Sequence, residues 1–216
     1  MILNYFNENR DQILSWLWYH AWLSAVPVVL GLAISLPLGW LAHRHRWMYA
    51  PLVSISGLLY TIPSIALFVV LPGLIGTKVL DPINVAVALT IYTVALLVRV
   101  VADGLASVPD DVAQSATAMG YKRRQRLIAV ELPIAVPVIA AGLRVAAVSN
   151  VSLVAVAATI GVPELGQLFT NGFQLAYYPP IIIGIVLCVA LALVFDTTIV
   201  LVTRFLTPWR RAVKAT

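Results

Sequence analysis

The chain has 216 residues, of which 61% are hydrophobic and 11% are charged, and its formal net charge at pH 7 is +5. Soluble domains contain roughly 45–50% apolar and about 25% charged residues. The single core of a soluble domain of 216 residues could not bury so much apolar surface. The composition therefore excludes a soluble globular protein and predicts an all-α integral membrane protein, with residues 1–216 forming a single transmembrane domain.

Five apolar runs approach or exceed the ~20 residues that a helix needs to cross the hydrocarbon layer. The predicted spans are residues 21–42, 52–75, 85–101, 136–160 and 181–202. The first run is too long for the apolar part of a cleavable signal, so we expect it to remain as a span.

Aromatic residues gather just before the first predicted span, at Trp16, Trp18, Tyr19 and Trp22. Such a cluster is typical of the belt that lies at a membrane interface. A cation–π site for a quaternary ammonium solute is the alternative, but the cluster has no partner acid beside it.

The first two spans carry small residues and prolines. Gly31, Ser35 and Gly39 recur at four-residue spacing, which gives one helix face that permits close helix contact. We expect a kink in the second span at Pro63.

Lys and Arg residues are distributed unevenly among the loops. Ten lie on one predicted side, against only Arg10 and Lys78 on the other, which indicates an outside N-terminus and a cytoplasmic C-terminus. The ten are Arg44, Arg46, Lys122, Arg123, Arg124, Arg126, Arg204, Arg210, Arg211 and Lys214. We interpret the basicity as topology and expect no nucleic-acid partner.

Few charges interrupt the spans, namely Arg99, Asp103, Arg144 and Asp196. A charge at a span centre costs roughly 2.5–3.5 kcal/mol on insertion scales, so each needs water or a partner. We favour cytoplasmic-end anchors and interhelical pairs over a proton or ion relay, which would need several acids near mid-membrane.

Motifs for catalysis or cofactor binding are absent from the sequence. It contains no GxxxxGK[ST] phosphate loop, HExxH zinc motif or GxSxG nucleophile elbow. We expect no catalytic residue, no metal and no bound cofactor, and Cys188 is interpreted as a small hydrophobe.

The loop at residues 104–135 is far longer than a connection between spans requires, which favours contact with something in the cytoplasm. Ser107 is expected to cap a helix that has Pro109 in its first turn. Val112, Ala116 and Met119 then form a narrow apolar stripe at helical spacing. A helix that merely lies on the membrane is the alternative.

Gly120 interrupts the helical pattern of the same loop and lets the chain turn with positive φ. A second, basic helix is expected over residues 122–131, stopping before Leu132-Pro133. Ala113 and Ala116 would let the surface of another protein approach closely.

This loop resembles the cytoplasmic motif of permease subunits in binding-protein-dependent ABC importers, which reads E-A-A, three residues, G, and L-P further on. The matching residues here are Gln114-Ser115-Ala116, Gly120 and Leu132-Pro133. Similar stretches elsewhere are Thr61–Leu67, Val98-Arg99, Gly104-Leu105, Ala141–Arg144, Ile160-Gly161, Leu165-Gly166, Asp196 and Leu206–Pro208. Together they resemble the osmoprotectant branch, whose members carry glycine betaine, choline, carnitine or proline betaine.

The resemblance implies the type I importer permease fold found in methionine importers, in a prokaryotic cytoplasmic membrane. It further implies a second permease copy or paralogue, a separate ATPase dimer that uses ATP, and an extracellular solute-binding protein. Gln114 stands where the motif has Glu, so Asp111 is a possible substitute for the missing carboxylate.

The resemblance also implies roles for individual residues. The expected ATPase-coupling residues are Asp111, Ala113, Gln114, Ala116, Met119, Gly120, Leu132 and Pro133. The candidates for the translocation pathway, which are polar or kinking within apolar runs, are Thr61, Pro63, Ser64, Asn150 and Ser152.

Three other readings stay open at this point. A methionine or polar amino-acid importer permease is the nearest. A stand-alone channel or secondary transporter would need more ionisable groups at mid-membrane, and a membrane enzyme would need a nucleophile–base or metal constellation.

In the loop of residues 161–180, Leu165–Tyr177 is expected to form a short surface or re-entrant helix.

Overall fold

The computed structural model describes residues 1–209, which form helices and no β-strand. The α-helices are α1 (Ile2–Glu8), α2 (Arg10–Arg44), α3 (Arg46–Thr61), α4 (Ser64–Ile75), α5 (Pro82–Ala106), α6 (Asp110–Ala118), α7 (Arg123–Arg126), α8 (Leu132–Val154), α9 (Gln167–Gln174) and α10 (Tyr178–Leu206). The all-α prediction is therefore confirmed for this part of the chain. The basic residues Arg210, Arg211 and Lys214 lie outside the described residues.

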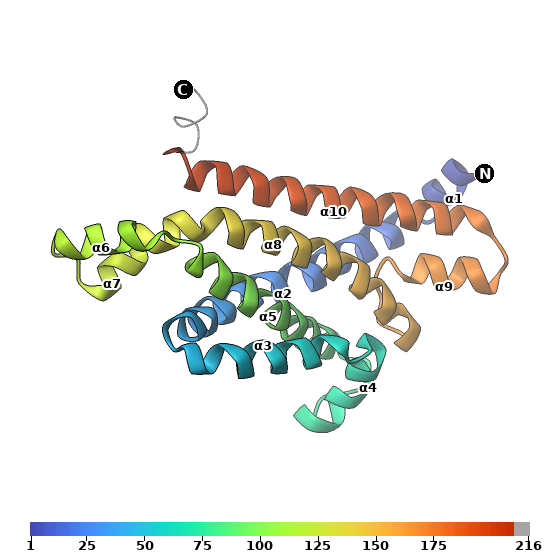
Figure 1. The fold of residues 1–216 in the computed structure, drawn as a ribbon. Helices are drawn as coiled ribbons and strands as arrows, with labels where there is room; N and C mark the ends of the chain where they lie inside the picture. Colours follow the sequence, from blue (N-terminus) through green and yellow to red (C-terminus); the bar gives the residue numbers. More distant parts are fainter. Residues whose placement is uncertain (210–216) are drawn as a thin grey trace.

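Four helical segments are long and apolar enough to cross a membrane: α2, α5, α10 and the continuous stretch Arg123–Ile160 that contains α8. Figure 1 shows α2, α5, α8 and α10 running along the length of the bundle, with α6 and α7 at one end and α1 and α9 at the other. The pair α3 and α4 counts as a fifth span if the two helices are taken together.

The second predicted span, residues 52–75, is wrong as a single helix. A bend of 102° separates α3 from α4. Pro63 has no N–H and forces Ile62 into an extended conformation (φ −65°, ψ 129°), so the expected kink is a complete break. The Tyr92 hydroxyl of α5 donates to the Ile62 carbonyl, which satisfies a backbone group that the break leaves free.

The first span is the middle of a longer helix, α2, whose 35 residues extend about 52 Å at 1.5 Å each. The aromatic cluster from Trp16 to Trp22 is part of the same continuous helix, at the start of the predicted span. The small face packs on α5 as predicted. A Cβ on Gly31 would lie 2.3 Å from Thr93, and one on Gly39 would lie 2.6 Å from Val101.

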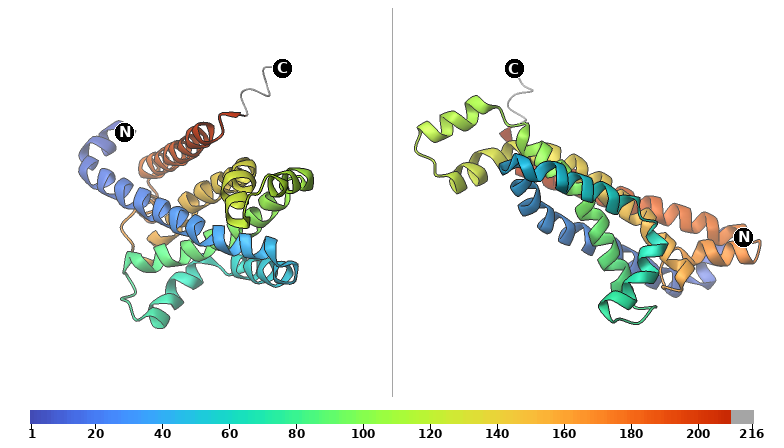
Figure 2. Two further views of the ribbon diagram at one scale, coloured as in Figure 1. Left: turned by 90° about the vertical axis from the view of Figure 1, so that its left-hand side faces the viewer. Right: turned by 60° about the horizontal axis from the view of Figure 1, so that its bottom comes forward.

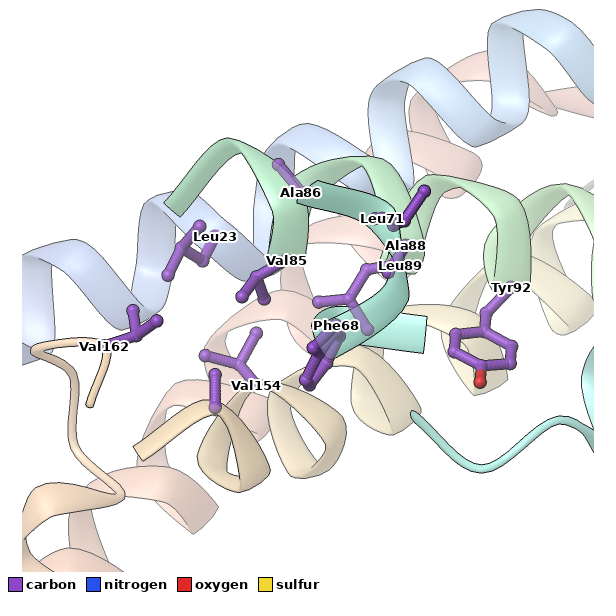
Figure 3. Packing of buried hydrophobic residues seen from close by; sticks show 11 residues of the cluster. Leu23, Phe68, Leu71, Val85, Ala86, Ala88, Leu89, Tyr92, Val154 and Val162 are labelled. Carbon is purple, nitrogen blue, oxygen red and sulfur yellow. The ribbon is translucent and has the colours of Figure 1, made fainter. Parts of the chain in front are cut away.

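The largest core cluster lies where α2, α4, α5 and the end of α8 meet. Phe68, Val85, Leu89 and Val154 are each fully buried there (Figure 3). Phe68 belongs to the short helix α4, so α4 is held to the bundle by its own buried aromatic ring although it is bent away from α3.

The predicted helix stop before Leu132-Pro133 is also wrong. A π-helical turn, Leu127–Glu131, joins α7 directly to α8, and the Leu132 amide donates to the Leu127 carbonyl five residues back. The wider turn accommodates Pro133, which has no N–H and would clash with the carbonyl four residues earlier in a regular α-helix.

The short helix expected over Leu165–Tyr177 is present as α9, Gln167–Gln174, and it packs against α10. A Cβ on Gly172 would lie 2.4 Å from Ile181, and one on Gly184 would lie 2.7 Å from Phe169. This close packing fixes the position of the loop between α8 and α10.

Candidate functional site

The coupling loop predicted from the sequence folds as a helical hairpin of α6 and α7, which we call the hairpin (residues 110–126). It projects from one end of the bundle, beyond the ends of α5 and α8 (Figure 2). Most of its side chains are exposed, among them Asp111, Gln114, Met119 and Arg124.

The hairpin begins differently from the prediction. Pro109, in an extended conformation (φ −61°, ψ 138°), occupies the N-cap position of α6. Ser107 does not cap α6, because its hydroxyl donates to the Gly104 carbonyl at 2.7 Å and so closes the end of α5. Asp110 and Asp111 lie in the first turn of α6, where the helix dipole favours negative charge.

The turn of the hairpin is built around Gly120, which has φ +87° as the sequence predicts. The Gly120 amide donates to the Thr117 carbonyl at 3.0 Å, and the Tyr121 amide donates to the Ala116 carbonyl at 3.1 Å. These two bonds form a Schellman motif, which satisfies the last carbonyls of α6. A residue with a Cβ would be strained at this φ.

Ala116 faces inward and is only 1% exposed, which corrects the expectation that it opens a surface to another protein. The small side chain instead lets α6 lie close to the chain after the turn. Arg126 ties the two arms together, donating to the Thr117 hydroxyl at 2.9 Å and to the Glu131 carboxylate at 2.6 Å.

A hollow of about 570 Å³ opens beside the turn of the hairpin. It is lined by Met119, Gly120, Tyr121, Arg124, Gln125, Ile128 and Ala129. Met119 is 69% exposed at its edge. An apolar methionine beside an exposed arginine offers both an apolar contact and a positive charge to a partner surface.

The remaining predicted coupling residues lie apart from this exposed surface. Leu132 and Pro133 are half-buried in the first turn of α8, and Leu132 packs against the cluster of Val101, Leu105 and Ile139. Ala113 is half-buried on α6. The structure thus places Leu132 and Pro133 at the base of the hairpin, where they join it to the bundle.

The pathway candidates divide into two groups. Thr61 and Pro63 are exposed at the α3–α4 break, with Ser64 half-buried beside them, and Ser152 is exposed on α8. Asn150 is buried (2% exposed), and its amide donates to the Thr93 hydroxyl of α5 at 3.0 Å. In this conformation Asn150 therefore joins α8 to α5 and faces no open surface.

The interhelical pairing expected for charges within the spans is confirmed for Arg144 and Asp196. Their side chains form a two-point ion pair between α8 and α10, at 2.6 and 2.9 Å. Arg99 and Asp103 pair along α5 at 3.4 Å. A second buried pair, His20 with Glu164, joins α2 to the loop before α9, and it could not be predicted from the sequence because its members lie 144 residues apart in the chain.

Within residues 1–209 no three His, Cys, Asp or Glu side chains are grouped as a metal site would require. The hairpin itself exposes polar and apolar side chains, and its two arms are braced by Arg126.

A comparison with protein families matches residues 31–211 to the model described as the inner membrane component of binding-protein-dependent transport systems. The chain belongs to this family. The match includes the hairpin and every helix from the second half of α2 to α10, so the permease is a multi-pass membrane transport component.

Curated relatives place the permease beside osmoprotectant importers. It is 36% identical over 197 residues to the osmoprotectant import permease protein OsmW of Salmonella typhimurium, covering 90% of this chain and 91% of the relative. It is 30% identical over 208 residues to the choline transport system permease protein OpuBB of Bacillus subtilis, covering 96% and 94%.

Solved structures confirm the predicted fold of the permease. A chain of the methionine ABC transporter MetNI, in an inward-facing conformation, superposes with a TM-score of 0.82 at 22% identity, covering 92% of this chain and 97% of that one. A chain of an amino acid ABC transporter gives a TM-score of 0.75 at 17% identity, covering 94% and 98%. The fold is therefore that of a type I importer permease.

Proposed function

We propose that the permease forms the membrane channel of an ATP-driven importer for an osmoprotectant, such as glycine betaine, choline, carnitine or proline betaine. The observation that carries this proposal is the similarity to osmoprotectant and choline permeases over nine-tenths of the chain. In this proposal the ATPase is a separate subunit, and the permease binds no cofactor of its own.

The hairpin is the proposed contact with the ATPase dimer. Its exposed face offers Asp111, Gln114 and Met119, and its internal bonds make it stiff enough to move as one body. Nucleotide-driven closure of the ATPases would then move the hairpin, and Leu132 and Pro133 would transmit that movement to α8. In this proposal the hairpin has two positions, and nucleotide binding to the ATPases favours one of them.

The proposed topology places the hairpin and the end of α10 in the cytoplasm and α1 and α9 outside, in the cytoplasmic membrane of a prokaryote. The basic residues Lys122, Arg123 and Arg124 then lie on the cytoplasmic side. An extracellular solute-binding protein would deliver its solute at the end that carries α9.

A second permease copy or paralogue completes the proposed pore, and lipid covers the rest. Helix α10 packs on α8, α9 and α1, and its other face is apolar and open, with Val186 59% and Leu193 61% exposed. Arg144 and Asp196 remain partly exposed at the edge of this face of α10. Charged side chains are costly in lipid, so we expect this edge to meet protein or water.

The test is reconstitution of the permease in vesicles with its ATPase subunit and its solute-binding protein. We expect uptake of radiolabelled glycine betaine or choline only when ATP and both partners are present. Solute flux with no ATPase would instead establish a channel or a secondary transporter. Uptake of methionine in place of the quaternary ammonium solutes would move the permease to the amino-acid importers, whose fold it shares.

A further inference from the structure

A fully buried pair of ionisable side chains lies near the end of the bundle that carries α9. His20 of α2 and Glu164 of the loop before α9 are both 0% exposed. The His20 Nδ1 atom lies 2.7 Å from the Glu164 Oε2 atom. Neither residue belongs to the hairpin or to the pathway candidates.

The hydrogen bonds of the pair determine how many protons it holds. The His20 Nε2 atom lies 3.0 Å from the Val151 carbonyl of α8, which can only accept, so Nε2 carries a proton. A second proton must lie between Nδ1 and Oε2. Oε2 also accepts from the Gly166 amide at 2.6 Å. The pair therefore holds two protons and has no net charge, as imidazolium with carboxylate or as imidazole with carboxylic acid.

Loss or gain of a proton would be costly at this position. With one proton fewer, a hydrogen bond is broken and an uncompensated negative charge is buried; with one more, the pair becomes a buried cation. Cys188 of α10 packs against the neighbouring cluster that contains Leu165 and Ile183. The Ser24 hydroxyl donates to the His20 carbonyl at 2.8 Å.

The loop that contains Glu164 is held on several sides by this pair. Val162 and Leu165 are also 0% exposed, so the loop is inserted into the bundle. A Cβ on Gly166 would lie 2.2 Å from the Ala155 carbonyl and 2.4 Å from the Glu164 Oε1 atom, so the chain passes there with no room to shift.

We propose that His20 and Glu164 are positioning residues for transport. Together they form a two-proton clasp that fixes the loop of residues 161–167 on α2 and α8, so that this end of the permease presents one constant surface to the solute-binding protein. The inference rests on the proposed function for its role in transport. The proton count rests on the geometry alone.

Glu164→Gln tests the role of the clasp in transport. The variant amide oxygen can accept from Gly166 and from Nδ1, but both His20 bonds then require a charged imidazole without a carboxylate partner. Such an unpaired buried charge is costly, so one of the two His20 bonds is lost and the loop is held less firmly. We expect the concentration of loaded solute-binding protein that half-saturates ATP-driven uptake to rise several-fold, with a smaller change in the maximal rate. The exposed-acid control Glu8→Gln is expected to change neither.

An unchanged half-saturating concentration in Glu164→Gln, with normally folded protein, would overturn the positioning role. The double variant His20→Leu/Glu164→Leu sharpens the test. It is expected to give a higher yield of folded permease than His20→Leu alone, because the single change leaves Glu164 buried with only the Gly166 amide and no side chain to share its proton. A double variant that folds less well than the single one would contradict the clasp.

The proton count is measured independently of transport, by nitrogen-15 NMR of the histidine-labelled permease in lipid bilayers. We expect the His20 ring signals to show a proton on Nε2 and a proton shared between Nδ1 and the Glu164 carboxylate. Signals of a ring with one nitrogen free of any hydrogen bond overturn the clasp. A permease that moves no osmoprotectant at any pH refutes the proposed function, and this spectrum still decides the proton count.

Discussion

The hairpin and the loop of residues 161–177 both connect long apolar helices, yet they are built in opposite ways. The hairpin projects from the bundle with Met119 69% exposed, and Ala116 is its one fully buried side chain. The other loop inserts Val162, Glu164 and Leu165 into the bundle, each with no exposure. The hairpin thus presents most of its side chains at the surface, whereas the other loop is packed inside the bundle.

The largest expected effect comes from filling the interior of the hairpin. The Ala116 side chain is only 1% exposed, so a tryptophan has no space there. Overpacking costs about 1–3 kcal/mol or more, which is roughly a 5- to 150-fold loss of the correctly folded hairpin. We expect ATP-driven uptake to be abolished while membrane insertion stays normal. Ala118→Trp, on the exposed side of the same helix, is the matched control and should retain most activity. Similar losses in both variants, or normal ATPase coupling in Ala116→Trp, would contradict the account.

The turn of the hairpin gives the next effect. Gly120→Val places a branched side chain at φ +87°, where a Cβ costs roughly 1–2 kcal/mol or more. We expect at least about a tenfold fall in uptake, and a smaller fall for Gly120→Asn because asparagine tolerates this conformation. Gly57→Val is the control, since a Cβ there meets nothing within 4 Å. If Gly57→Val is as damaging as Gly120→Val, the turn has no special role.

These features differ in how far they could be predicted from the sequence. The spans could be predicted from hydropathy, and the turn at Gly120 from a glycine at the end of a helical pattern, because both are local properties. The carbonyl that the break leaves free, that of Ile62, is bonded by Tyr92, which lies 30 residues further along the chain. The direction in which Ala116 faces depends on where the second arm of the hairpin packs.

The clasp illustrates a second limit of sequence reasoning. A single histidine in an apolar helix carries no signal of its partner, and Glu164 reads as an ordinary loop acid. The coupling and pathway roles of the predicted residues, including Thr61 and Ser152, stay predictions.

A contact outside both of these regions is tested by Tyr92→Phe. The change removes the hydroxyl that donates to the Ile62 carbonyl, and the loss of such a part-buried bond costs about 0.5–1.5 kcal/mol. We expect a lower midpoint of thermal unfolding. Tyr60→Phe is the control, because Tyr60 packs edge-on against Tyr92 but is itself 45% exposed. An equal shift for both variants would show that ring packing and not the hydrogen bond matters.

The smallest effect is expected at the brace of the hairpin. Arg126→Met removes the bonds to Thr117 and Glu131, each contributing about 1 kcal/mol or less at this partly exposed position. Hydrogen exchange of the α6 amides should become several times faster. Arg124→Met, which removes an exposed charge beside the hollow, should leave that exchange unchanged. Unchanged exchange in Arg126→Met would show that the arms are held by packing alone.

The central claim, that the hairpin is the cytoplasmic contact with the ATPase, is tested most directly by site-specific cross-linking. In a Cys188→Ala background, Met119→Cys marks the hairpin and Trp18→Cys, 72% exposed, marks α2 near the opposite end of the bundle. We expect the cysteine at position 119 to cross-link to the ATPase subunit, in a nucleotide-dependent manner, and to resist a membrane-impermeant thiol reagent applied to whole cells. Labelling of position 119 from outside, or cross-linking of the ATPase to position 18 instead, would contradict the account.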